Sequence, residues 1–253
     1  MAYTDIDDPT AYFQSNLHTG NSGTNAITFS GNSDLQPDWI WIKERGATGF
    51  HVLTDTVRGI TKQIYSNDTQ TENTNSSSVT AIGSNGFTLG NRADVNNNSD
   101  TYVSWNWKAG GSASNNTDGS LTVSLSANQD AGFSIATFTS SGSGVDTLGH
   151  GLGAAPSMII IKSTSNSSTN WSIYHKSIGN NKEILFNTGA ASTNTMWNNT
   201  TPTSTLWNLK TGNFGTNRGG VAYCFADVQG YSKVSGSYVG NGNADGTFVY
   251  TGF

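Results

Sequence analysis

The sequence contains little charge, little proline and almost no cysteine. Of its 253 residues, 11% are charged, four are proline and one, Cys224, is cysteine, so no intrachain disulfide can form. The 12 Lys and Arg lie scattered and form no basic stripe, which argues against nucleic-acid binding. Stability must therefore come from packing and from hydrogen bonds between strands.

Long apolar runs are also missing. The longest clear one, residues 158–161, is far short of the roughly 20 residues of a membrane helix, so we expect no membrane insertion. The N-terminus is acidic where a secretory signal would be basic and then apolar. We therefore expect synthesis in a cytoplasm.

The chain is instead rich in small polar residues and in aromatic residues. Asn, Ser, Thr and Gly account for nearly half of the chain, and 7 Trp, 9 Tyr and 11 Phe argue for ordered packing rather than disorder. Segments with apolar residues at every second position alternate with Gly-containing turns, and no helical period is sustained. This composition excludes a helical bundle, a coiled coil and a membrane protein, and it predicts an all-β fold.

An internal repeat of about 119 residues is the most informative feature of the sequence. Four pairs of segments recur in one order with nearly constant displacement, which predicts a duplicated domain rather than a solenoid of short repeats. The pairs are residues 12–13 and 132–133, 35–43 and 154–162, 50–53 and 171–174, and 102–107 and 220–225.

We therefore predict two tandem β-sandwich domains followed by a C-terminal hairpin. The expected divisions are an N-terminal arm (1–11), a first sandwich (12–111), a linker with a strand (112–130), a second sandwich (131–230) and a partial third repeat ending in the hairpin (231–253).

Two strand patterns carry specific expectations about burial. Residues 39–42 are apolar on both faces, which predicts a strand covered by a layer on each side. In residues 102–107, Val103, Trp105 and Trp107 share one face, so Trp105 and Trp107 should be mostly buried.

No residue pattern predicts a catalytic, cofactor or metal site. Glu occurs only at positions 44, 72 and 183 and in no paired arrangement, whereas glycoside hydrolysis requires two facing carboxylates. The four His share no ligand spacing, and an Asn-rich turn at residues 94–100 leaves calcium undecided. Cys224 alternates with aromatic residues in an apolar strand, which favours a packed thiol over a nucleophile.

Two groups of residues are candidates for contacts. Trp197, followed by Asn198 and Asn199, either offers an exposed platform for a sugar or closes the open end of its sandwich. In the expected hairpin, Phe248, Tyr250 and Phe253 lack the rest of a third repeat to bury them, so they are candidate assembly contacts, with a neighbouring copy or with the second sandwich.

Several motifs resemble a known family. They are IDDPTAYFQ (6–14), QPDWIWIK (36–43), YVSWNWKAG (102–110), VAYCFA (221–226) and GYSK (230–233). Together they resemble repeat-containing virion proteins, tail-fibre-like or appendage proteins, of marine tailed bacteriophages. Members of that family typically continue into a full third repeat, so this sequence is a natural short form, a processed product or a truncated chain.

The resemblance implies a phage particle and a non-enzymatic role, without functional residues to carry over. The first hypothesis is a tail-fibre or surface-appendage component on the virion surface, a homo-oligomer that contacts other virion proteins and host surface glycans. The second is a capsid-decorating protein of the phage head. The third, from another class, is a virion-associated glycan hydrolase, which needs a carboxylate pair in a groove.

Overall fold

The computed structural model describes residues 4, 6–186, 189, 191–234 and 236–250. These residues form a nearly all-β chain of antiparallel sheets, as the sequence predicted. Within them no helix has the length and apolar character needed to span a bilayer. The helical pieces found there are short turns, namely η1 (Pro9–Ala11), α1 (Ala93–Asn96), η2 (Lys176–Ile178) and α2 (Thr211–Phe214).

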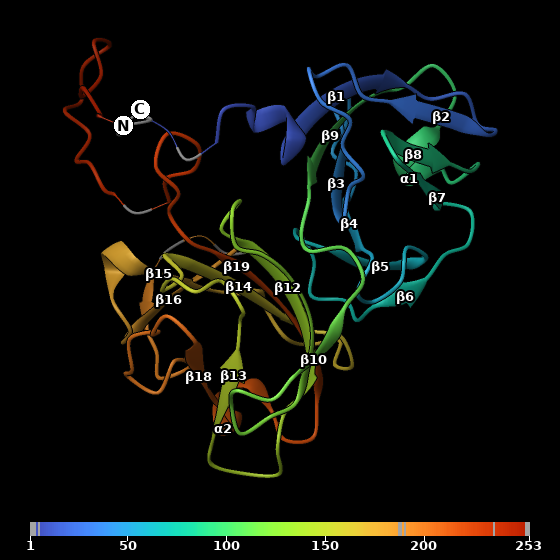
Figure 1. Ribbon diagram of the computed structural model, residues 1–253. Coiled ribbons are helices and arrows are strands. Elements are labelled where there is room, and N and C mark those ends of the chain that lie inside the picture. Colours follow the sequence, from blue (N-terminus) through green and yellow to red (C-terminus); the bar gives the residue numbers. More distant parts are fainter. Residues whose placement is uncertain (1–3, 5, 187–188, 190, 235, 251–253) are drawn as a thin grey trace.

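The first half of the chain is a sandwich of a six-stranded and a three-stranded sheet (Figure 1). The larger sheet has the order β1-β9-β3-β4-β5-β6, and the smaller one has the order β2-β8-β7. Ile40, Ile42 and Phe87 belong to the apolar core between them. The strands are β1 (Phe13–Thr19), β2 (Asn25–Thr28), β3 (Trp39–Glu44), β4 (His51–Asp55), β5 (Lys62–Tyr65), β6 (Asn73–Thr74), β7 (Val79–Gly83), β8 (Gly86–Leu89) and β9 (Thr101–Trp107).

The second half pairs an eight-stranded sheet, ordered β10-β11-β12-β19-β14-β15-β16-β17, with a two-stranded sheet of β13 and β18. Ile159, Ile161 and Trp207 belong to the apolar core of this sandwich. The strands are β10 (Ser114–Asn116), β11 (Val123–Asn128), β12 (Phe133–Thr139), β13 (Val145–Gly149), β14 (Met158–Ser163), β15 (Ser172–His175), β16 (Lys182–Leu185), β17 (Ser192–Thr193), β18 (Leu206–Lys210) and β19 (Gly219–Phe225).

The two halves share one strand order. Strands β1, β9, β3, β4, β5 and β6 correspond in sequence position and sheet order to β12, β19, β14, β15, β16 and β17. The single-turn helices α1 and α2 also follow equivalent strands, β8 and β18. A duplicated domain requires this agreement, although β10 and β11 extend the second half alone.

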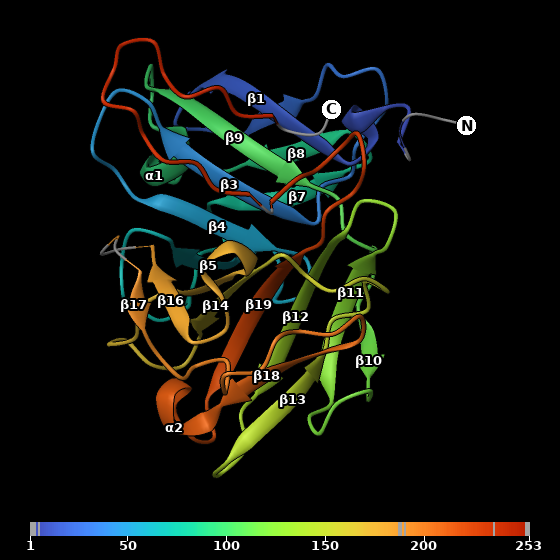
Figure 2. The same ribbon diagram turned by 90° about the vertical axis from the view of Figure 1, so that its left-hand side faces the viewer.

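The two large sheets pack against each other through a third apolar core, so the described chain is a stack of four β layers (Figure 2). Trp39 of the first half stacks on Tyr223 and Phe133 of the second, with ring centroids 4.3 and 5.7 Å away. Strands β3 and β14 are therefore covered on both faces. This arrangement explains why residues 39–42 and 158–161 are apolar at every position.

The expected burial of Trp105 and Trp107 on strand β9 agrees with the structure, in which both side chains are more than half buried. Ser104 and Asn106, on the opposite face, are buried completely. Asn106 Nδ2 donates to Gln14 O (3.0 Å) and to Ser104 Oγ (3.0 Å), so these hydrogen bonds compensate for burying polar groups there.

Residues 112–130 are more than a linker. Strand β11 pairs with β12 along five residue pairs, and β10 pairs with β11, so the segment forms the edge of the second large sheet. The strand expected there exists.

The C-terminal hairpin expected over residues 237–253 is wrong for the residues that the structure describes. Residues 236–250 contain no strand, although Thr247 Oγ1 donates to Val239 O over 2.8 Å and so joins the two arms of a loop. Residues 236–250 pair with no described strand, and two strands alone are marginal in water.

Candidate functional site

The structure places Trp197 in the core rather than on the surface. Its side chain is 1% exposed, its Nε1 donates to Lys182 O (3.0 Å), and its ring packs near Tyr174 and Trp207. The expectation of an exposed sugar platform at Trp197 is therefore wrong, and the alternative, a plug inside the sandwich, describes it.

Asn198 and Asn199 follow Trp197 in a tight turn. Both have left-handed backbone angles, with φ of 52° and 50°, which Asn tolerates better than most residues. Thr200 N donates to Trp197 O (3.0 Å) and closes the turn. Turn geometry thus accounts for this Asn pair, and the buried indole beside it offers no ring face for stacking.

The candidate assembly residues lie on an exposed segment. Phe248 is 88% exposed and Tyr250 is 69% exposed, while Phe253 lies outside the described residues. Tyr238 and Val239, in the same segment, are 68% and 86% exposed. Exposed apolar side chains this close together are typical of contact surfaces.

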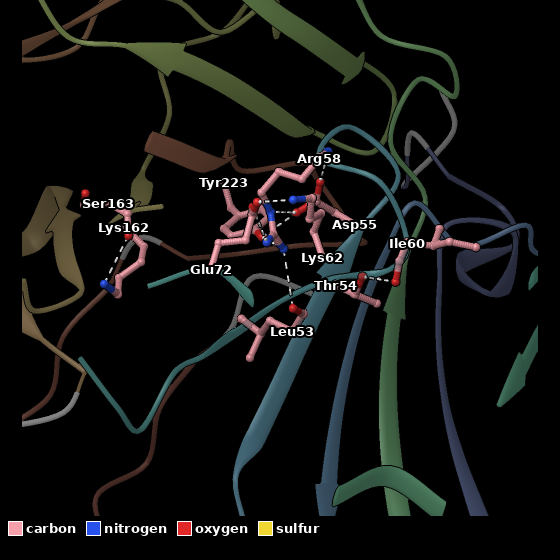
Figure 3. A network of polar contacts seen from close by, with 10 residues as sticks. All are labelled: Leu53, Thr54, Asp55, Arg58, Ile60, Lys62, Glu72, Lys162, Ser163 and Tyr223. Carbon is pink, nitrogen blue, oxygen red and sulfur yellow. Dashed lines mark hydrogen bonds and ion pairs between the residues drawn. The ribbon is translucent and has the colours of Figure 1, made fainter. Parts of the chain in front are cut away.

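A buried polar cluster around Arg58 joins the two halves (Figure 3). Strand β4 ends at Asp55, and the chain then turns through Gly59, whose φ is +102°, a conformation that glycine adopts without strain. The turn brings Arg58 back onto Asp55, where Arg58 Nε lies 2.6 Å from Asp55 Oδ2. On its outer side, Arg58 Nη1 lies 3.2 Å from Glu72 Oε2.

The second half contributes Tyr223 to this cluster. Tyr223 Oη donates to Asp55 Oδ2 (2.8 Å) and accepts from Arg58 Nη2 (3.3 Å). Burial raises the pKa of Tyr223 well above its usual value. Burial alone would lower the pKa of Arg58, but its interactions with Asp55, Tyr223 and Glu72 together outweigh burial and raise that pKa. The cluster thus contains a charged guanidinium and a neutral phenol at neutral pH.

A cavity of about 510 Å³ lies beside the cluster, between the two halves. Arg58 and Glu72 line it from the first half, and Thr139 and Thr164 from the second. Glu72 is bound by Arg58 and by Lys62 Nζ (3.3 Å), so it is held as an ion-pair partner. The Arg58 guanidinium bridges the carboxylates of Asp55 and Glu72. This arrangement favours a structural role for the two carboxylates over the acid–base pair of a glycosidase.

Lys162 provides a second buried link between the halves. Its Nζ donates to Thr69 O of the first half (3.2 Å) and to Ser163 O and Thr169 Oγ1 of the second. These three bonds use every N–H of an ammonium group. Burial lowers the pKa of Lys162 to about 8. Its repeat equivalent, Lys43, also donates to nearby backbone carbonyls.

Sequence reasoning missed the cluster, although one signal was present. Asp55 and Arg58, three residues apart and followed by Gly59, fit a turn in which the carboxylate binds the guanidinium and the backbone N–H of Arg58. Nothing in the sequence indicates that Tyr223 contacts Asp55 and Arg58. Its equivalent in the first repeat, Trp105, has no such role, so the repeat gives no indication either.

The fold and the buried polar contacts define an all-β protein of two packed sandwiches, which buried polar side chains help to hold together. Among the described residues, no three His, Cys, Asp or Glu side chains gather as metal ligands would. Residues 8–253 match the family described as a domain of unknown function, DUF7483, and the chain belongs to this family. No curated protein and no solved structure matches the chain.

Proposed function

We propose that this chain is a non-enzymatic structural protein of a phage particle, a tail-fibre or surface-appendage component that acts by display and contact. The observation that carries the proposal is the exposed C-terminal segment, residues 236–250. Five apolar side chains there are 47% to 88% exposed, namely Tyr238, Val239, Phe248, Val249 and Tyr250. Such a segment gains stability when a neighbour covers it.

The body of the chain suits a scaffold. Three apolar cores and the Arg58 cluster join its layers, so contacts made at one end are held in fixed geometry relative to the other. Asn-, Ser- and Thr-rich turns keep a β protein hydrated at high local copy number. The sequence resemblance to phage appendage proteins points to the same role.

The proposed contact of the C-terminal segment is with a second copy of the chain. In the described structure its residues form no strand and add to no sheet. Lys233 Nζ lies 5.9 Å from the ring centroid of Tyr250, and this exposed cation–π contact is too weak to replace an apolar covering. A homo-oligomer would bury these rings.

Light scattering of the full chain and of the chain lacking residues 237–253 tests the oligomer. The full chain should be oligomeric and the shortened chain monomeric, with the same unfolding midpoint for the sandwiches. Phe248→Ser should act in the same direction, whereas Leu17→Ser, at another exposed apolar position (63%), should leave the oligomer intact. An unchanged oligomer after the deletion contradicts the proposed contact.

Immunogold labelling of intact particles tests the location. Label along tail appendages supports the proposal, and label on the head supports a capsid-decorating protein instead. Particles without label, from a lysate that contains the protein, contradict both.

A further inference from the structure

Strand β1 forms an open edge of the first large sheet. It is the outermost strand in the order β1-β9-β3-β4-β5-β6, and Figure 2 shows it at the margin of that sheet. An open edge can pair with a strand of another chain, and natural proteins usually prevent this with lysine, proline or a bulge. The residues of β1, Phe13–Thr19, include no lysine and no proline, and they pair with β9 without a shift of register.

Alternate residues of β1 direct their backbone groups away from β9. Just beyond the two ends of the strand, Gly20 N donates to Asp100 O (2.8 Å) and Lys108 N donates to Tyr12 O (2.9 Å). In an antiparallel ladder, every second residue exchanges hydrogen bonds with the partner strand. The even-numbered residues of β1 therefore bond to β9, and the N–H and C=O groups of the odd-numbered residues point to the open edge.

Three of these outward residues are available for pairing. Outside the ladder with β9, the backbone N–H and C=O groups of Phe13, Ser15 and Leu17 make no hydrogen bond to any described residue. Ser15 is exposed and Leu17 is 63% exposed, so another chain can reach this edge. Thr19 O, in contrast, already accepts from Asn25 Nδ2 (3.0 Å). The free part of the edge therefore ends before Thr19.

The repeat shows what fills this position in the second half. Strand β12 corresponds to β1, and its equivalent edge is occupied by β11 between Phe133 and Thr137, the equivalents of Phe13 and Leu17. Strand β10 then pairs with β11. The fold thus accommodates two further antiparallel strands at this position. Beside β1, no described segment takes the place of β10 and β11.

The C-terminal segment has the layout of β10 and β11. Two short arms, residues 237–239 and 247–250, are joined by residues 240–246, much as β10 and β11 are joined by residues 117–122. The hydrogen bond described above already connects the two arms. The segment therefore resembles a pair of strands that has no sheet to join.

The second arm has the residue pattern of a strand. Phe248 and Tyr250 alternate with Thr247 and Val249, and aromatic and β-branched residues favour strands. All four residues are exposed, and none of them pairs with a described strand. Pairing with an open edge would satisfy their backbone groups and cover one face of the arm.

A second copy of the chain supplies both parts of this contact. Each copy carries one open β1 edge and one unpaired C-terminal segment, so identical chains match each other without a further partner. Figure 1 shows the segment, in red, apart from β1 of its own chain. The segment is therefore placed to reach outward to a neighbour.

We propose that residues 247–250 of one copy add as a strand to β1 of a second copy, with residues 237–239 beside them. In strand addition of this kind, backbone hydrogen bonds provide the affinity, here to Phe13, Ser15 and Leu17. A change confined to the Leu17 side chain therefore leaves the contact intact. The inference rests on the proposed function, and it names the surface that the C-terminal segment contacts.

Ser15→Pro tests the edge. Proline removes the outward N–H of residue 15, which no bond to β9 uses, and proline is tolerated where the N–H of an edge strand faces solvent. The dissociation constant of the oligomer, measured by sedimentation velocity, should rise at least about tenfold. The matched control is Asn115→Pro, at an exposed position of β10 on the edge of the other large sheet, and it should leave the constant unchanged.

Disulfide cross-linking tests which segments meet. Chains carrying Ser15→Cys are mixed with chains carrying Thr247→Cys or Val249→Cys, and each mixture is oxidised with copper phenanthroline. A disulfide requires Cα atoms within about 7 Å of each other, so at least one mixture should give a linked heterodimer. Mass spectrometry of the joined peptides identifies the link. Cys224 is buried and should not take part.

Thermal unfolding first establishes that Ser15→Pro is folded, and if it is not, the cross-link decides. The inference is overturned if folded Ser15→Pro assembles as the wild type does, or if neither mixture gives a heterodimer. It is also overturned if Ser15→Cys and Val249→Cys placed in one chain link within a monomer, because the segment would then cover its own β1.

The deletion of residues 237–253 separates this inference from the proposed function. If the deletion dissociates the oligomer and Ser15→Pro does not, the segment remains the assembly contact and β1 is not its acceptor. A monomeric full chain would contradict both.

Discussion

Tyr223 donates a hydrogen bond of 2.8 Å to Asp55, a residue 168 positions earlier in the chain and in the other sandwich. Both side chains are buried, and Arg58 contacts both of them. This contact couples the turn after β4 to the middle of β19. The two sandwiches are therefore joined by directional bonds as well as by apolar surface.

Replacing Arg58 should destabilise the whole chain. Arg58→Met leaves Asp55 buried without its cation, and breaking such a pair typically costs about 3–5 kcal/mol of unfolding free energy. The control is Arg92→Met, which removes an exposed ion pair with Asp94 and should cost under about 1 kcal/mol. Urea unfolding measures both, and equal losses would mean that the Arg58 cluster adds no cohesion.

Trp39 and Trp105 should respond differently to truncation. Trp39 is 1% exposed and stacks on rings of the second sandwich, so Trp39→Ala should cost about 3–5 kcal/mol. Trp105 is half-buried, so Trp105→Ala should cost clearly less. The urea unfolding midpoints of the two variants, compared at equal m-values, measure the two losses of stability. A larger loss at Trp105 would show that the face of β9 is covered in solution.

Cys224 should be unreactive in the folded protein. Its side chain is fully buried, and burial raises the pKa of the thiol to about 12, so thiolate is scarce at pH 8. Iodoacetamide at pH 8 should modify Cys224 in urea and leave it unmodified in native buffer, as read by mass spectrometry. Rapid labelling of native protein would place this strand at the surface.

Lys162 should make stability depend on pH in the alkaline range. Its folded pKa of about 8 lies below the value near 10.4 of an unfolded lysine. Between these values the unfolded chain binds more protons, so the unfolding free energy contributed by this group rises with pH. From pH 7.5 to 9.5, wild type should gain about 1–2 kcal/mol relative to Lys162→Met.

The comparison with Lys162→Met isolates one titration. Buried tyrosines and Cys224 titrate in both proteins, so their effects cancel in the difference. Lys62→Met, at a side chain 39% exposed, serves as the control and should follow the wild type in its pH dependence. A wild-type curve parallel to that of Lys162→Met would mean that Lys162 keeps an ordinary pKa.

Much of the fold could be read from local pattern. Alternation with a period of two and glycine at turns predicted an all-β chain, because backbone geometry alone places successive side chains on opposite faces. The apolar run at residues 39–42 predicted a strand covered on both sides, and the repeat, which pairs this run with residues 158–161, predicted two sandwiches. The structure has these strands in equivalent places.

Which face of each strand is covered, and by what, depended on contacts between distant residues. The sequence determined that β9 alternates, but the packing inside the first sandwich, where Tyr102 on the same face joins the core, decided that Asn106 is buried more deeply than Trp105. Likewise the polar residues after Trp197 left open whether its ring is exposed or closes the sandwich, and the packing decided that it is buried. The pairing of Asp55 with Tyr223 and the cavity beside Arg58 arise only when separate strands meet. A sequence determines the period of each strand, whereas tertiary packing decides which polar atoms lose water and must find a partner.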